Sequence, residues 1–179
     1  GVVEALMQKM GLREVAQYDP EAGKSFLHPG RQARVIYQGR EIAYLGEVHP
    51  AVADTYGIGT RAYVAVLDIL NVVKHATFDR KYEGIAKYPA VNRDISMVVP
   101  KNILVGEIEH MIAQRGGKIL EHYELFDIYE GSQIQAGFKS VAYSITFRSK
   151  DKTLEESEVS AAMKKILNGL ESMGIELRK

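Results

Sequence analysis

The sequence predicts an α+β protein in which antiparallel strands and helices form two successive units. Segments with apolar residues at every second position indicate strands, and they alternate with segments whose apolar residues recur every three or four positions, as in helices. Between residues 76 and 88 this periodicity disappears and the chain becomes basic and aromatic, which is typical of a linker. We therefore predict one unit in residues 1–77, a linker in 78–88 and a second unit in 89–179.

The first unit is predicted to start with a helix over Val2–Met10, followed by a turn-rich loop. Two alternating segments, "ARVIYQ" and "EIAYLGEVH", flank Gly39–Arg40 and predict a hairpin. A short helix after Pro50 and a strand over Ala62–Asp68 follow. Because these elements do not close a core of their own, we expect them to belong to an antiparallel sheet domain whose earlier strands precede Gly1.

The second unit is predicted to have the order strand–helix–strand–strand–helix–strand. The first strand is "RDISMVVP", and the first helix, "LVGEIEHMIAQRGG", ends at Gly116–Gly117. The next strands are "ILEHYELFDIYE" and "GFKSVAYSITFR". Thr153 and Glu156 have the spacing of a capping box for the second helix, which ends at Gly174 before a last strand, "IELR". This order predicts a ferredoxin-like βαββαβ sandwich with two helices on one face of the sheet and the other face open.

Alternation sorts the strand side chains between these two faces. In the third strand of this unit the large apolar residues occupy odd positions, so the small and polar residues at even positions from 140 to 146 are expected on the open face. In the strand before it, Phe126 and Ile128 are predicted to point inward and Asp127 and Tyr129 outward, beside Ser140.

Four chemically different side chains are therefore expected on the open face: Tyr129, Asp127, Ser140 and Arg178. An aromatic ring can stack on an unpaired base, a carboxylate can accept hydrogen bonds from base N–H groups, and a guanidinium can stack or contact phosphate. The same residue types are also common on ordinary solvated surfaces, and nearby glutamates dilute the positive charge. The candidates for contacts to an RNA backbone are Lys139, Arg148, Lys150 and Lys152.

Composition excludes several classes of protein. Lys and Arg together number 23, as do Asp and Glu, so the whole chain has no net attraction for a polyanion. The absence of cysteine excludes disulfides and thiolate metal sites and fits a reducing cytosol. No apolar run approaches the length of a membrane span, and no phosphate-binding loop or metal-ligand pattern is present. His28 and His49 each precede a proline, and we interpret both as turn or surface residues rather than catalytic ones.

Five segments occur in a distinctive order: "YPAVNRDISMVV", "LFDIYEG", "GFKSVAYSITFRS", "TLEESEV" and the terminal "ELR". Together they resemble the ferredoxin-fold anticodon-binding domain that ends the beta subunit of bacterial phenylalanyl-tRNA synthetases. The earlier segments "GVVEALMQKMGL" and "SFLHPGRQARVIYQGREIAYLGEVHPAV" are similar to the end of the catalytic-like module just upstream in that subunit, a class II synthetase-like antiparallel α+β fold that has lost its chemistry. The resemblance implies that this sequence is a piece of a longer chain.

The resemblance implies recognition of the tRNA(Phe) anticodon within a cytoplasmic phenylalanine–tRNA ligase. In that family the parent enzyme uses ATP and Mg, and the chemistry belongs to the alpha subunit of an alpha2beta2 heterotetramer. The implied partners are tRNA(Phe) and the alpha subunit, and the implied chain has no catalytic residue, bound metal or cofactor. The family's stacking residue corresponds to Tyr129, and its other anticodon contacts correspond to Asp127, Ser140 and Arg178. The family's "RD" pair corresponds to Arg93–Asp94, which we interpret as structural.

Three alternatives remain open at this point. A small-molecule regulatory domain of the ACT type shares the strand–helix order, but it needs a Gly-rich turn where this sequence offers only Gly106. An RRM-like RNA-binding domain would need exposed aromatic residues where Tyr143 and Phe147 are predicted to be buried. A structural domain would instead pack its open sheet against another protein chain.

Overall fold

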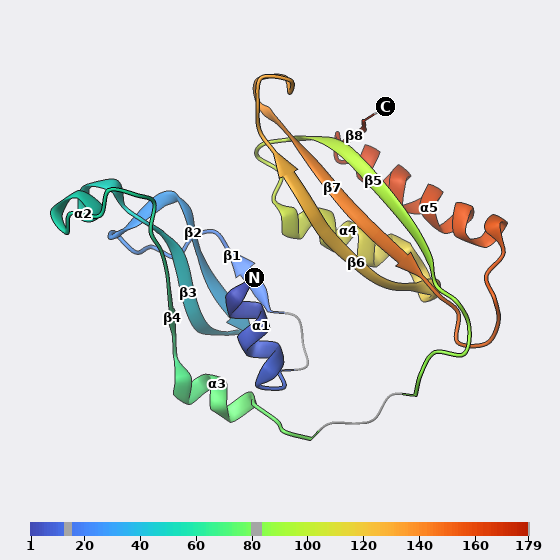
Figure 1. The fold of residues 1–179 in the computed structure, drawn as a ribbon, viewed down its shortest axis with the longest axis horizontal. Coiled ribbons are helices and arrows are strands. Elements are labelled where there is room, and N and C mark those ends of the chain that lie inside the picture. The colour runs from blue at the N-terminus through green and yellow to red at the C-terminus, as the bar shows by residue number, and fades with distance from the viewer. Residues whose placement is uncertain (13–15, 80–83, 179) are drawn as a thin grey trace. The chain divides into compact units, whose positions relative to one another are not determined.

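The computed structural model describes residues 1–12, 16–79 and 84–178. The chain divides into two compact units, residues 1–82 and 83–179, each with its own four-stranded sheet (Figure 1). The division falls within the segment 78–88. Within the described ranges, no helix is long and apolar enough to cross a membrane.

The first unit is built on an antiparallel sheet with the strand order β1-β2-β3-β4. The predicted hairpin is confirmed, because β2 and β3 are joined at Gln38 and Gly39, whose φ values of 47° and 75° suit a tight hairpin turn. Three short helices accompany the sheet. The elements are α1 (Val2–Lys9), β1 (Gln17–Asp19), β2 (Leu27–Tyr37), β3 (Arg40–Val48), α2 (Pro50–Thr55), β4 (Tyr63–Leu67) and α3 (Ile69–His75).

Contrary to the prediction, the elements of the first unit form a small hydrophobic core of their own. Side chains of α1, β2 and β3 meet Val72 of α3, a helix that the sequence pattern did not predict. This helix begins after Asp68, whose Oδ1 accepts a hydrogen bond from the Asn71 main-chain N at 3.1 Å. The core residues are Met7, Leu12, Val35, Tyr37, Ile42, Ala43 and Val72.

β4 lies at the edge of this sheet. Of the strands that the structure describes, only β3 pairs with it. Tyr63 of β4 is 67% exposed, and Val64 and Val66 are also exposed. β4 therefore presents apolar side chains and a row of main-chain groups to solvent along the same edge.

The second unit has the predicted order and fold, a ferredoxin-like sandwich. Its sheet has the order β6-β7-β5-β8, and every neighbouring pair is antiparallel (Figure 1). The two helices pack on one face of this sheet and leave the other face open. The elements are β5 (Val91–Pro100), α4 (Val105–Gly116), a 3₁₀ turn (Gly117–Ile119), β6 (Leu120–Tyr129), β7 (Phe138–Phe147), α5 (Glu156–Glu171) and β8 (Glu176–Leu177).

The core of the second unit lies between the helices and the odd-numbered side chains of β5 and β7. Tyr143 and Phe147 are fully buried there, as predicted, which leaves them unable to stack on bases in the manner of an RRM. The Tyr143 hydroxyl lies 3.3 Å from Glu109 Oε1 and donates a hydrogen bond to it. The strand and helix residues of this core include Ile95, Met97, Val99, Ile108, Ile112, Val141, Ile145, Val159, Ile166 and Leu170.

The predicted cap of α5 is wrong by two residues. The helix begins at Glu156, so Glu155 is its N-cap, and the Glu155 main-chain N donates to Glu158 Oε2 at 3.1 Å. Leu154 is buried, so the chain turns into the helix only after this side chain has entered the core. Glu156, which was predicted to complete a box with Thr153, instead accepts from Arg93 Nη2 of β5 at 2.7 Å.

Candidate nucleic-acid interface

A bulge in β6 changes which of its side chains face the open side. Leu125 lies opposite Tyr143 on the helix-covered side, and Asp127 lies opposite Ala142 on the open side, so Phe126 is an extra residue between the two pairs. Phe126 is 58% exposed, and the prediction that it points into the core is wrong. The bulge lets the strand pack Leu125 against the core and still present Asp127 outward.

The predicted site residues Asp127, Tyr129 and Ser140 lie on the open face of adjacent strands. Tyr129 is directly opposite Ser140, and Asp127 lies two residues earlier on the same side. Ile128, between them, lies opposite Val141 and so keeps the predicted inward side, although its side chain remains exposed near the end of the sheet.

Arg178 reaches the same face from the far edge of the sheet. Its main-chain N donates to Ser96 O at 2.8 Å, which continues the β5–β8 register one residue beyond β8. Ser96 is paired with Ala142, and Ala142 with Asp127. Asp127, Ala142, Ser96 and Arg178 therefore form one row across the four strands, about 14 Å long at three strand spacings.

A second row lies next to the first and consists of Tyr129, Ser140, Val98 and Glu176. The two rows share a pattern in which small side chains occupy the two central strands and large polar or aromatic side chains occupy the edges. Ser140 is only 4% exposed, because Tyr129 and Val98 flank it on either side. A ligand atom must therefore reach down between these side chains to meet the Ser140 hydroxyl.

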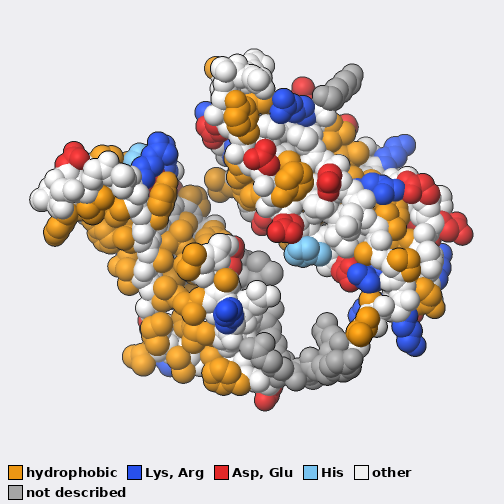
Figure 2. All heavy atoms as spheres, viewed as in Figure 1, with side chains coloured by type: hydrophobic (Ala, Val, Ile, Leu, Met, Phe, Trp, Pro, Cys, Tyr) orange, Lys and Arg blue, Asp and Glu red, His pale blue; other side chains and the backbone are white. Residues whose placement is uncertain are grey.

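The charge on the open face is mainly negative. Strand register puts four acidic residues on this face and, among the described residues of β5 to β8, no Lys or Arg. Arg178 and Arg148 each continue the pairing one residue beyond a strand, and Arg148 is paired with Glu121. Figure 2 shows acidic side chains, together with basic ones, on the visible side of the second unit. Such a face favours hydrogen-bond donors of a base over phosphate groups. The four acidic residues are Asp94, Glu124, Asp127 and Glu176.

The structure removes Lys139 from the candidates for backbone contacts. Its side chain is on the helix-covered side, where Nζ donates to Ile103 O at 2.7 Å, and the residue is only 9% exposed. Burial lowers the pKa of the Lys139 ammonium, and the carboxylates of Glu130 and Glu107 oppose this effect. Lys139 therefore stabilises the turn before α4 and is a poor candidate for an RNA contact.

Two of the other three cations are engaged within the protein. Arg148 Nε lies 2.9 Å from Glu121 Oε1, and its Nη1 donates to Tyr88 O at 3.0 Å, so it ties the end of β7 to the residues before β5. Lys152 Nζ pairs with Glu158 Oε1 at 2.9 Å, and this contact raises the pKa of the lysine. Lys150 lies in the exposed loop after β7.

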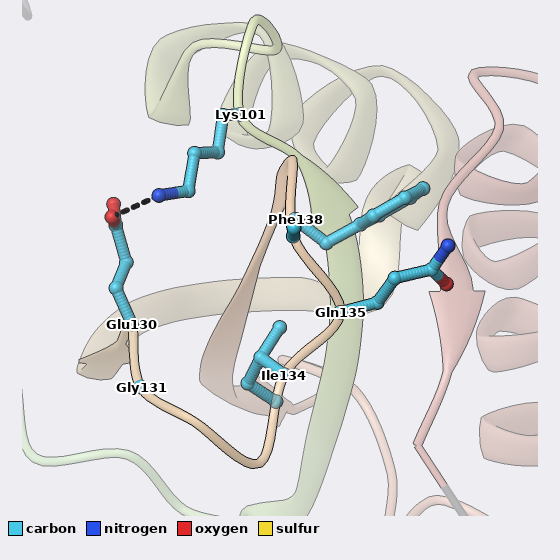
Figure 3. Close-up of a pocket in the computed structure, with 7 residues that line it drawn as sticks. Lys101, Glu130, Gly131, Ile134, Gln135 and Phe138 are labelled. Atoms are coloured by element: carbon cyan, nitrogen blue, oxygen red, sulfur yellow. Dashed lines mark ion pairs between the residues drawn. The ribbon is translucent and has the colours of Figure 1, made fainter.

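A shallow hollow of about 280 Å³ lies beside the loop that joins β6 to β7 (Figure 3). Lys101 Nζ and Glu130 Oε2 form an ion pair of 2.7 Å on one side of it. The loop itself carries no cation, and the nearby Lys101 is neutralised by this pair. The other lining residues are Gly131, Ile134, Gln135, Ala136 and Phe138.

In the parts of the chain that the structure describes, no cluster of three or more His, Asp and Glu side chains is arranged to hold a metal ion. His28 Nδ1 accepts from the Gly30 main-chain N at 3.1 Å, and His49 Nδ1 accepts from the Ala51 main-chain N at 3.2 Å. His28 therefore makes a local main-chain contact near the start of β2, and His49 caps α2 rather than a turn.

The fold of this second unit is a ferredoxin-like sandwich with one open sheet face, and comparison with known families is specific. A model of the ferredoxin-fold anticodon binding domain matches residues 86–178, and a model of the phenylalanyl tRNA synthetase beta chain CLM domain matches residues 1–69. The chain belongs to the family of ferredoxin-fold anticodon binding domains. This confirms the resemblance inferred from the sequence.

Individual relatives agree with the family models. The chain is 40% identical over 179 residues to the phenylalanine–tRNA ligase beta subunit of Clostridium acetobutylicum, covering 99% of this chain and 22% of that protein. It is 42% identical over 180 residues to that of Clostridium tetani, with the same coverage. It is 37% identical over 171 residues to that of Bacillus subtilis, covering 96% of this chain and 21% of the relative. The chain thus spans about a fifth of the length of these relatives.

Proposed function

We propose that the open face of the second unit recognises the anticodon of tRNA(Phe) as part of a phenylalanine–tRNA ligase. The observation that carries this proposal is the strand register, by which Asp127, Tyr129, Ser140 and Arg178 share two adjacent rows of one face. The family assignment supports the same role. The curated relatives, which are phenylalanine–tRNA ligase beta subunits, support the choice of amino acid.

Each of the four residues has a distinct task in this proposal. The Tyr129 ring stacks on an unpaired base, and the Asp127 carboxylate accepts hydrogen bonds from the N–H groups of a base edge. The Ser140 hydroxyl forms a hydrogen bond at the bottom of the face, where few atoms can reach it. Arg178, at the opposite edge, contacts a phosphate or stacks on a second base.

The acidic character of the open face supports recognition of bases rather than of the sugar–phosphate backbone. Four carboxylates repel phosphate, so a bound RNA loop gains little from charge attraction. Those carboxylates disfavour any RNA that does not present base donors to the face. We therefore expect this face to bind RNA with modest affinity and to discriminate strongly between anticodon sequences.

The chemistry of aminoacylation belongs elsewhere in this proposal. We assign ATP activation and the Mg requirement to the parent ligase, whose alpha subunit holds the reaction centre of a cytoplasmic alpha2beta2 heterotetramer. This chain then contributes anticodon binding, and its first unit contributes to assembly. The absence of a nucleophile and base pair at any motif spacing in the sequence supports a non-catalytic role.

The test is fluorescence anisotropy of the 179-residue chain with a labelled anticodon stem-loop carrying GAA, against one with a scrambled anticodon. We expect the chain to prefer GAA at low salt. Tyr129→Ala should weaken GAA binding about 5- to 150-fold, the equivalent of about 1–3 kcal/mol for one stacked base. Tyr56→Ala is the matched control, because Tyr56 is an exposed tyrosine of the first unit. Equal affinity of wild type and Tyr129→Ala would refute the stacking role.

A further inference from the structure

The ring of Tyr129 leans over the main chain of Gly131, two residues later in the loop. A β-carbon built at Gly131 would overlap the Tyr129 hydroxyl and Cζ, and would lie 2.9 Å from Cε1. No side chain larger than hydrogen fits there while the ring keeps its place. Tyr129 is nevertheless 41% exposed, so the ring also presents surface to solvent.

The main chain at Gly131 does not itself require glycine. Its φ lies outside the left-handed region, unlike that of Gly137 in the same loop, whose φ is 89°. Such a φ is also open to residues that have a side chain. The need for glycine at this position therefore comes from the tyrosine ring and not from the turn.

The loop beneath the ring is held in place by contacts on both sides. The Ile134 main-chain N donates to Gly131 O at 2.9 Å, and the Lys101 main-chain N donates to Gly137 O at 2.9 Å. The ion pair between Lys101 and Glu130 links the same loop to the end of β5 (Figure 3). Because the loop is restrained, an added methyl group at Gly131 must displace the ring rather than the main chain.

We propose that Gly131 is a positioning residue that fixes the Tyr129 ring on the open face before RNA arrives. This inference rests on the proposed function, because it concerns how the stacking platform of that same site is held. A ring already seated against the loop loses less side-chain freedom when a base stacks on it than a ring free to rotate. Gly131→Ala should therefore weaken the stacking of an unpaired base on Tyr129, although the alanine itself makes no contact with the RNA.

The first arm of the test examines the ring without RNA. In the wild-type chain the Gly131 Hα resonances should be displaced from their ordinary positions by the ring current of Tyr129, and Tyr129→Ala should remove that displacement. Gly131 resonances that are the same in the two proteins would overturn the proposal, whatever the RNA measurements give.

The second arm is a double-mutant cycle on affinity for the GAA stem-loop. Gly131→Ala should lower affinity about 2- to 10-fold, the range expected when one side chain must be ordered again on binding. In the Tyr129→Ala background the same substitution should change nothing. The control is Gly106→Ala, because Gly106 lies in α4 with open space around the position of a β-carbon.

Three outcomes of the cycle separate this inference from the proposed function. An unchanged affinity in Gly131→Ala, with Tyr129→Ala weakened, overturns the positioning role alone. An equal loss in both backgrounds also overturns it, because Gly131 would then act independently of the ring. If the Gly131 resonances show the ring-current shift but Tyr129→Ala leaves affinity unchanged, the proposed stacking function is refuted. The predicted effect of Gly131 on RNA affinity is then refuted as well. Thermal unfolding of each variant checks that the second unit remains folded.

Discussion

Asp127 and Arg178 lie at opposite ends of one row that crosses all four strands of the second sheet, with Ala142 and Ser96 between them. Their main chains lie about 14 Å apart at three strand spacings, which is farther than the carboxylate and the guanidinium can reach toward each other. Each is therefore available to a ligand laid across the small residues in the middle. Because of this separation, Asp127 and Arg178 can contact two different parts of one RNA loop.

Asp127→Asn tests the carboxylate at one end of the row. The amide keeps the shape of the side chain but removes the charge and replaces one acceptor oxygen with an NH₂ group that donates. It therefore accepts hydrogen bonds from the N–H groups of a base less well than the carboxylate does. We expect affinity for the GAA stem-loop to fall by about 1.5–3 kcal/mol, the usual value of a hydrogen bond to a charged group.

Affinity for the scrambled stem-loop should stay the same or rise, because the face becomes less acidic. Anisotropy titrations of both RNAs with both proteins measure the change in preference. If Asp127→Asn retains the wild-type ratio of the two affinities, Asp127 does not read a base.

Arg178→Ala tests the other end through salt dependence. Because the open face carries four carboxylates, we expect the wild-type chain to bind with a shallow slope of log affinity against log salt. If Arg178 meets one phosphate, its removal should flatten that slope by about 0.7. Titrations at several salt concentrations measure it, with Lys164→Ala for comparison, because Lys164 is an exposed cation of α5 on the helix-covered side of the sheet. A weaker affinity with an unchanged slope would assign Arg178 to a base instead.

Tyr143→Phe tests a buried hydrogen bond and its dependence on pH. Burial, and secondarily the nearby Glu109, raises the pKa of the Tyr143 hydroxyl above its ordinary value. The folded state therefore keeps the proton when the unfolded chain has lost it, so the free energy of unfolding should fall as pH rises above about 10.

At neutral pH Tyr143→Phe should lower the free energy of unfolding by about 0.5–1.5 kcal/mol, and above pH 10 it should lose stability less steeply than wild type. Urea denaturation at pH 8 and pH 11 compares the two proteins. Parallel losses of stability between these pH values would contradict the assignment to Tyr143.

Gly11→Ala tests the packing of the first unit. Gly11 follows α1 with a φ of 77°, and a β-carbon there would overlap the Thr77 carbonyl oxygen. The left-handed conformation alone costs an alanine about 1–2 kcal/mol, and the overlap with main chain adds to this. Gly23→Ala has a similar φ of 65° but open space, so it isolates the conformational term.

Hydrogen exchange should show faster opening of α1 in Gly11→Ala than in Gly23→Ala, with the second unit and its RNA affinity unchanged. Equal exchange in the two variants would indicate that the contact with Thr77 does not constrain the first unit.

The sequence predicted the features of the second unit that repeat regularly. The odd and even residues of β7 differ so clearly in size and polarity that the buried and open faces could be assigned from periodicity alone. The same alternation gave the correct sides for Asp127 and Tyr129. The first unit was harder, because β1 and α3 are too short to carry a periodic pattern.

The errors arose where distant segments decide the outcome. A bulge is set by pairing with another strand and cannot be seen in the alternation of one strand alone. Strict alternation therefore assigned Phe126 to the wrong side of the sheet. Lys139 was a candidate for a contact to an RNA backbone, but its ammonium donates to the carbonyl oxygen of Ile103, 36 residues away in sequence. Glu156 was expected to cap its own helix, but its carboxylate instead accepts a hydrogen bond from Arg93 of β5. None of these partners is visible in the local sequence.

The exposed edge at β4 has a consequence for the behaviour of the chain in solution. A bare strand edge with apolar side chains such as Tyr63 and Val66 is a template for another extended segment, including β4 of a second molecule. Pairing of this kind would join two chains through their first units at high concentration. Apparent RNA affinity would then depend on protein concentration for a reason unrelated to the anticodon, and dilute conditions separate the two effects.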